Sequence, residues 1–228
     1  MTARDVRLRS IALATMIVGV VAAGAVFGQP ANLPATVVTL SGRAEVWRAP
    51  TRTWSAVRLR DEVFAGDGVR TIAGRLVLRT GSDQALRLGA RTPILFVEPE
   101  PGVAGGGGPT TVRMDGGLLW VAVLPASPPP SQITVRAGPA TVTVRGGGAS
   151  VAMNADGSVT VADYHGVTTV AAAGWQRDLT QDQQVVIPPA GPPKEVVPLK
   201  RDKRDAEWAK WNEQQDSAGG FGARIEKR

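Results

Sequence analysis

Residues 133–147 read Ile-Thr-Val-Arg-Ala-Gly-Pro-Ala-Thr-Val-Thr-Val-Arg-Gly-Gly, and this stretch shows most directly which kind of fold the chain adopts. The run that begins at Ile133 recurs nine residues later at Val142, with apolar residues alternating with Thr and Arg before two small residues. A period of two places the apolar residues on one face of an extended strand and the polar residues on the other. The stretch therefore predicts two short β-strands, and the glycines at 146–148 predict a turn after the second.

The same pattern fills the chain from about residue 35 to residue 198. Short runs of Val, Leu, Ile and Thr are separated by turn residues such as Asp67-Gly68 and Asp156-Gly157, where glycine accepts a positive φ. Several runs are spaced by eight to ten residues, which suits a small β-solenoid and suits a β-meander almost equally. We therefore expect an all-β domain, with many short strands in a compact solenoid-like or sandwich-like arrangement. The predicted strands are Thr36–Leu40, Arg43–Arg48, Arg75–Arg79, Gln84–Leu88, Ile94–Val97, Leu118–Leu124, Ile133–Arg136, Val142–Arg145, Ser158–Ala162 and Val167–Ala171.

The first 29 residues predict an export signal or a membrane anchor. Three arginines lie before residue 10, and an uncharged run of 17 residues, Ile11–Phe27, follows them. The small residues at 23–25 offer a cleavage site, but the run is also just long enough to span a bilayer. Cleavage and retention as an inner-membrane anchor both stay open, and in either case we expect the domain to be periplasmic.

Residues 199–228 predict a charged helix and a disordered tail. Acidic residues lie near the start of 201–216 and Gly219-Gly220 follows it, as is typical of helix ends. Trp208 and Trp211 have helical spacing and are our candidate interaction surface for a partner or a membrane interface. Because exposing two indoles is costly, we favour the alternative in which the helix folds back and the rings cover an open edge of the β-domain.

Composition excludes several kinds of chemistry. The chain has no cysteine, so disulfides and thiolate sites are excluded. The net charge of +6 is spread along the chain without a basic stripe, so we expect no nucleic-acid partner. The single histidine, His165, lies two residues after Asp163, and on a strand the two would share a face, but the other ligands of a metal site are missing. We therefore predict no catalytic residue, no metal and no cofactor.

Several motifs together resemble FecR-type domains. Residues 62–71, Glu-Val-Phe-Ala-Gly-Asp-Gly-Val-Arg-Thr, resemble the L-x-x-G-D-x-[VI]-R-T signature of that family. Matches in the family's order extend over about residues 40–187, although the family's Thr-Pro is Gly-Pro here, at 138–139. We expect the signature to form a structural turn in which the Asp67 carboxylate caps neighbouring backbone N–H groups. The signature residues of this turn are Gly66, Asp67, Arg70 and Thr71, and the further matches are Gly81-Ser82, Leu86, Leu88, Thr92, Ile94, Gly117–Val123, Pro139–Gly146, Asp156-Gly157 and His165-Gly166.

The resemblance implies an extracytoplasmic role. The named members of the family relay a signal from outer-membrane iron-siderophore receptors, and a short cytoplasmic segment controls a sigma factor. Only about ten residues precede Ile11, so we do not expect that control here. The chain looks more like stand-alone exported FecR-domain proteins, many of which carry a Trp-containing helix after the domain.

We therefore expect a non-enzymatic binding or scaffolding module whose partner is an envelope protein or a cell-wall polymer. Two alternatives remain. One is a membrane-anchored signalling component, which requires that Ile11–Phe27 stays in the inner membrane. The other is an enzyme acting on cell-wall polysaccharide, for which the sequence offers no catalytic constellation.

Overall fold

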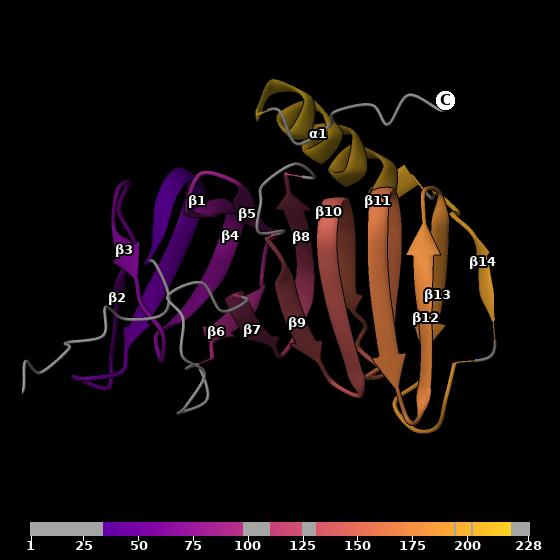
Figure 1. Cartoon of the computed structure of the whole chain (residues 1–228). Coiled ribbons are helices and arrows are strands. Elements are labelled where there is room, and N and C mark those ends of the chain that lie inside the picture. The colour runs from indigo at the N-terminus through magenta and orange to yellow at the C-terminus, as the bar shows by residue number, and fades with distance from the viewer. Residues whose placement is uncertain (1–33, 98–109, 125–130, 194, 202, 220–228) are drawn as a thin grey trace, which may run out of the picture.

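The computed structural model describes residues 34–97, 110–124, 131–193, 195–201 and 203–219, so the predicted signal or anchor at 1–29 lies outside the described residues. The all-β prediction is confirmed: strands fill this part of the chain, and a single helix follows them (Figure 1). The elements are β1 (Ala35–Arg48), β2 (Thr53–Ala56), β3 (Glu62–Val63), β4 (Gly68–Thr80), β5 (Gln84–Leu88), β6 (Pro93–Phe96), β7 (Thr110–Met114), β8 (Gly117–Val123), β9 (Ile133–Ala137), β10 (Ala140–Met153), β11 (Val159–Ala172), β12 (Trp175–Thr180), β13 (Gln183–Ile187), β14 (Val196–Pro198) and α1 (Lys203–Gly219).

Seven strands close a ring in the order β4–β5–β8–β10–β9–β7–β6 and back to β4. Strands β4 and β10 belong to both sides of the ring because each changes its neighbour along its length. The second half of β4 pairs with β5 and its first half with β6, while β10 pairs first with β9 and then with β8. We call the side with β5 and β8 the helix-side wall, and the side with β6, β7 and β9 the opposite wall.

The closed ring decides between the two architectures that the sequence left open. Every described strand pair is antiparallel except β7–β9. A solenoid of stacked equivalent strands would not return to its first strand, so the fold is a barrel-like sandwich. Strands β1, β2 and β3 extend it beyond β4, and β11 to β14 extend it beyond β10.

Most of the described strands are short, as predicted, but β1, β4, β10 and β11 have 13 or 14 residues and bend where two glycines face each other. Strand β11 runs through both Ser158–Ala162 and Val167–Ala171, and the glycines at 146–148 lie inside β10 and not in a turn. Gly147 and Gly166 face each other across these strands at φ +89° and +119°. A Cβ on Gly147 would lie 1.6 Å from the carbonyl oxygen of His165. Only glycine therefore allows the two backbones to cross from one wall to the other without ending the strands.

A second pair of facing glycines allows β1 and β4 to bend together. Gly42 and Gly74 are opposite each other at φ +92° and +83°, and a Cβ on Gly74 would lie 1.8 Å from the carbonyl oxygen of Ser41. The predicted runs Thr36–Leu40 and Arg43–Arg48 are consequently one strand, β1. A glycine between two alternating runs therefore marks a bend at these four positions and not a turn.

The core lies between the two walls and consists almost entirely of aliphatic side chains. Leu76, Leu78, Leu86 and Leu88 are completely buried there, and each contributes about 1.5–3 kcal/mol by leaving water. A second, smaller cluster combines side chains of β5, β8 and β11 with Trp208 and Ala209 of α1, and Figure 1 shows α1 at the side of the molecule where β8, β10 and β11 end. Within the described residues, no helix has both the length and the apolar character needed to cross a membrane.

Candidate binding groove beside the C-terminal helix

Helix α1 buries one narrow face against the outer side of the helix-side wall. Trp208, Ala209, Asn212 and Asp216 lie on that face at spacings of one, four and eight residues, and none is more than 6% exposed. Two of the four are polar, so apolar contact alone does not hold the helix. The helix runs from Lys203 to Gly219, slightly beyond the predicted end at residue 216.

A buried carboxylate ties the helix to the sheet. Asp216 accepts hydrogen bonds from Arg87 Nη1 at 2.6 Å and from Trp120 Nε1 at 3.0 Å. His165 Nε2 lies 3.3 Å from the same carboxylate. The side chains of Arg87 and Asp216 are 3% and 0% exposed, and burial lowers the pKa of Arg87 while Asp216 partly opposes that shift. Gly148 makes room for the cluster, because a Cβ there would lie 2.7 Å from the Asp216 carboxylate.

The two predicted tryptophans lie over a face of the sheet and not over its edge, which corrects the expectation from the sequence. Trp208 packs with Trp120 and Tyr164 of the central strands β8 and β11. Trp211 stacks on Trp208 with ring centroids 5.6 Å apart, and the guanidinium of Arg75 lies 4.6 Å from the Trp211 ring. Their spacing was visible in the sequence, but the strands that they cover are brought together only by the fold.

A groove of about 790 Å³ runs over the same face beside α1. Its floor is an array of small and neutral polar side chains on three neighbouring strands. The cross-strand register places Ala162 between Ser150 and Gln184, and Ala152 beside Thr160. The full lining is Ala90, Arg91, Asp115, Gly116, Gly117, Leu118, Ser150, Ala152, Met153, Asn154, Ala155, Gly157, Thr160, Ala162, Tyr164, Gln184, Leu199, Lys200 and Trp208.

The lining favours a ligand with many hydroxyl and amide groups. Ser150, Thr160, Asn154 and Gln184 provide donors and acceptors without net charge. Trp208 and Tyr164 add aromatic rings at one side. Trp208 Nε1 is also buried with no hydrogen-bond acceptor among the described residues. Trp208 was predicted from the sequence but the floor was not, because single serines, threonines and alanines on strands carry no local signal.

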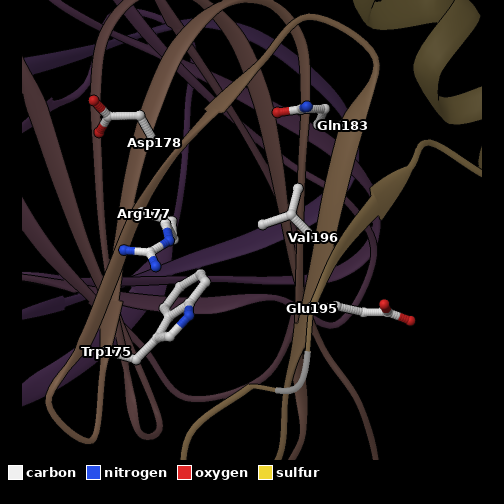
Figure 2. A pocket seen from close by; sticks show the side chains of 6 residues that line it. All are labelled: Trp175, Arg177, Asp178, Gln183, Glu195 and Val196. Atoms are coloured by element: carbon white, nitrogen blue, oxygen red, sulfur yellow. The ribbon is translucent and has the colours of Figure 1, made fainter.

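A second, smaller opening of about 360 Å³ lies at the end of the sandwich, between β12 and the pair β13–β14. Figure 2 shows Trp175 and Arg177 on one side of this opening and Val196 with Gln183 on the other. None of these residues was among the predicted functional residues. Strands β12 and β14 each have one described neighbour, so the opening lies where the two walls end.

Hydrogen bonds to Asp67 stabilise the turn formed by the signature residues. The Asp67 carboxylate accepts hydrogen bonds from the backbone N–H groups of Ala49 and Phe64 and from Arg48 Nη1, at 3.0, 3.2 and 2.8 Å. This is the capping arrangement that the sequence suggested. The positive φ of +87° is at Gly66, whereas Gly68 begins β4, so the turn lies two residues before the predicted Asp67-Gly68.

The other two signature residues also bind within the domain. Arg70 donates to Glu45 from Nε at 2.8 Å and from Nη2 at 2.6 Å, and it lies 4.0 Å above the Trp54 ring. Thr71 is buried; its hydroxyl donates to the carbonyl of Gly89 and accepts from the backbone N–H of Thr92. Arg70 and Thr71 thus lie with Asp67 on the β1–β4 side of the fold and not in the groove.

Asp163 and His165 do not act as a pair, contrary to the expectation that they share a face. A register shift between Gly148 and Ala149 disrupts the alternation of β11 there. Asp163 accepts a hydrogen bond of 2.6 Å from the Thr168 hydroxyl, while His165 lies against Asp216. Burial raises the pKa of Asp163 to about 6.

Comparisons with known proteins find only distant likeness. No family model matches the chain, and no curated protein matches it. Two solved structures that resemble it are crystal structures of "a putative anti-sigma factor" from Parabacteroides distasonis ATCC 8503. The first is 17% identical with a TM-score of 0.48, covering 62% of this chain and 64% of that chain. The second is 18% identical with a TM-score of 0.47, covering 61% of this chain and 62% of that one. The chain thus spans less than two thirds of the length of either.

Proposed function

We propose that the protein is an exported, non-enzymatic binding module of the FecR type that holds an envelope polymer, a glycan strand of the cell wall, in the groove beside α1. The observation that carries the proposal is the lining of the groove: neutral hydroxyl and amide side chains on three neighbouring strands, with the largely buried rings of Trp208 and Tyr164 at one side and the charged residues Arg91, Asp115 and Lys200 also in the lining. Sugars present hydroxyl and N-acetyl groups around a ring with an apolar face, and this lining complements both.

The shape of the floor supports an extended ligand. The floor spans β10, β11 and β13, whose residues repeat at the spacing between strands of about 4.8 Å. Small residues such as Ala152 and Gly117 leave the floor shallow, so a chain of sugar rings can lie across several strands. Such a surface favours one long polymer over a compact cofactor, which sites that enclose it bind best.

Helix α1 has a defined part in this function. It supplies Trp208 to the groove and is fixed by the buried contact of Asp216 with Arg87. The helix therefore acts as a wall whose position decides how wide the groove is. This role explains why a helix with so few apolar residues is held by a buried ion pair.

The test is binding to the polymer itself. The full chain is sedimented with purified peptidoglycan sacculi and titrated with soluble glycan oligosaccharides released from them. Ala152→Trp fills the groove from its floor, and Asn154→Ala with Gln184→Ala removes two amides. Thr141→Trp, on the exposed face of the opposite wall, is the matched control.

We expect Ala152→Trp to weaken binding at least tenfold, the amide pair to weaken it by about tenfold for two lost hydrogen bonds, and Thr141→Trp to bind like the native chain. The proposal fails if neither sacculi nor oligosaccharides bind, or if Ala152→Trp binds as well as the control. Envelope proteins captured in place of glycan would assign the groove to a protein partner and overturn the choice of polymer.

Export is tested separately. Mass spectrometry of the mature N-terminus together with membrane fractionation distinguishes cleavage near residues 23–28 from retention of Ile11–Phe27. A cleaved, soluble protein supports the free periplasmic module. An intact, membrane-bound protein supports the inner-membrane form and moves the search towards the signalling alternative, whereas a chain that stays in the cytoplasm contradicts export altogether.

A further inference from the structure

The end of the sandwich formed by β1, β2 and β3 carries an unusual set of exposed apolar side chains. Val38, Trp54, Leu59 and Phe64 are 43%, 43%, 60% and 50% exposed. They are four of the six large apolar residues that are this exposed in the described part of the chain. Single exposed apolar residues are ordinary, but a concentration at one end marks an interaction surface.

The same end is rich in arginine. Residues 35–64, which contain β1, β2 and β3, hold five arginines and three acidic residues, a net charge of +2, whereas residues 81–219 contain 12 basic and 14 acidic residues, a net charge of −2. Arg52 and Arg60 are exposed at φ +53° and +70°, where glycine would be free of strain. Arginine therefore occupies two positions at which the backbone conformation favours glycine.

Backbone hydrogen bonds hold part of this set in place. Residue Arg60 donates its backbone N–H to Val37, which in turn donates to Asp61, so the loop that carries Leu59 lies along the start of β1. Figure 1 shows β2 and β3 at one end of the molecule, with β14 at the other. The basic and apolar residues thus share the end that lies away from β13 and β14.

The chain enters the domain at this end. Ala35, the first residue of β1, pairs with Val63 of β3. Only seven residues, 28–34, separate it from the apolar run Ile11–Phe27, and seven residues reach at most about 25 Å when fully extended. If that run lies in the inner membrane, the β1–β3 end is the part of the domain nearest the lipid.

We propose that the β1–β3 end docks on the surface of a bilayer that contains anionic phospholipid. The guanidinium groups of Arg52, Arg58 and Arg60 bind lipid phosphates, and Trp54, Leu59 and Phe64 enter the headgroup region. The orientation leaves the helix-side groove free. This inference does not depend on the ligand of that groove.

The absence of cysteine permits a site-specific test in the full chain. Leu59→Cys carries an environment-sensitive fluorophore at the proposed contact. Val186→Cys carries the same fluorophore on β13 and is the control, because Val186 is, like Leu59, an exposed aliphatic residue. Each is mixed with phosphatidylcholine vesicles and with vesicles that also contain phosphatidylglycerol. The label at position 59 should shift to the blue only with phosphatidylglycerol and should lose that shift at high salt, while the label at position 186 should not respond.

The charge contribution is tested with Arg52→Gly and Arg60→Gly in the Leu59→Cys chain, since both glycines suit the positive φ and preserve folding. Each arginine near an anionic surface strengthens binding about fivefold, so the pair should lower docking about 25-fold. Arg136→Gln with Arg145→Gln removes two exposed charges from the opposite wall and should change little. Equal responses with both vesicle types, equal responses at positions 59 and 186, or no response at position 59 would each overturn the proposal.

Discussion

Replacing Asp216 with Asn should release α1 from the sheet and leave the β-domain folded. The substitution keeps the size of the side chain but removes the negative charge that faces Arg87, whose side chain is 3% exposed. Removing one partner of a buried ion pair costs up to about 3–5 kcal/mol, and the cost here is reduced because Arg87 also donates to the carbonyl oxygen of Asn212. That cost applies only while the helix is docked.

The free-energy terms of helix docking decide whether the substitution affects α1 or the β-domain. Burying the Trp208 indole removes about 200 Å² from water and contributes about 5 kcal/mol, the largest apolar term in helix docking. Ordering the helix opposes this gain, since an isolated helix of 17 residues is marginal in water. The net docking free energy is therefore less than the Trp208 gain alone suggests, and we expect the penalty at Arg87 to be relieved by undocking of α1 and not by unfolding of the β-domain.

Hydrogen exchange measured by mass spectrometry reports this directly. Peptides from α1 should lose protection in Asp216→Asn, while peptides from β5 and β8 keep it. Glu213→Gln is the control, because the Arg201–Glu213 pair at 3.1 Å is exposed and contributes less than about 1 kcal/mol. Arg87→Met combined with Asp216→Leu should restore much of the protection by replacing the buried pair with apolar contact. Unchanged protection in Asp216→Asn, or a double variant no better than the single one, would refute the reasoning.

Three further predictions concern the stability of the β-domain, measured by denaturant unfolding. Burial raises the pKa of Asp163 from 3.8 to about 6, so the protonated form that favours folding is lost as the pH rises through 6. Asp163→Asn should therefore change the stability little at pH 4 and raise it by up to about 3 kcal/mol at pH 7.5. Equal effects of the substitution at both pH values would contradict this. Gly147→Ala should lower the stability of the β-domain by more than about 4 kcal/mol, because the new Cβ would meet the carbonyl oxygen of His165. Gly174→Ala, at φ +77° with open space around it, should cost only about 1 kcal/mol. Similar costs for the two substitutions would show that the bend is not the cause. Asp67→Ala should cost about 2–4 kcal/mol because two backbone donors and Arg48 lose their acceptor, and a cost below about 1 kcal/mol would show that the turn holds without its cap.

Much of the fold was predictable because it depends on local chemistry. Alternation located Gln84–Leu88 as a strand with the bounds that the structure has, and Asp156-Gly157 does form a turn, with Gly157 at φ +81°. The capping role of Asp67 follows from the Asx chemistry of a short polar side chain beside glycine. The candidate site was predictable only through Trp208, since its other parts have no periodic or compositional signal.

The sequence by itself determined that the chain is all-β with a C-terminal helix, because side-chain alternation, turn residues and helix ends act over a few neighbouring residues. Only the tertiary structure decided where strands bend and which residues meet. The sequence predicts a turn at Gly147, whereas the structure places Gly147 inside a strand opposite Gly166. The partner of Arg87, Asp216, lies 129 residues away in the chain. The physical reason is that both outcomes depend on cross-strand register and burial, which the closed ring sets through contacts that no local stretch of sequence contains.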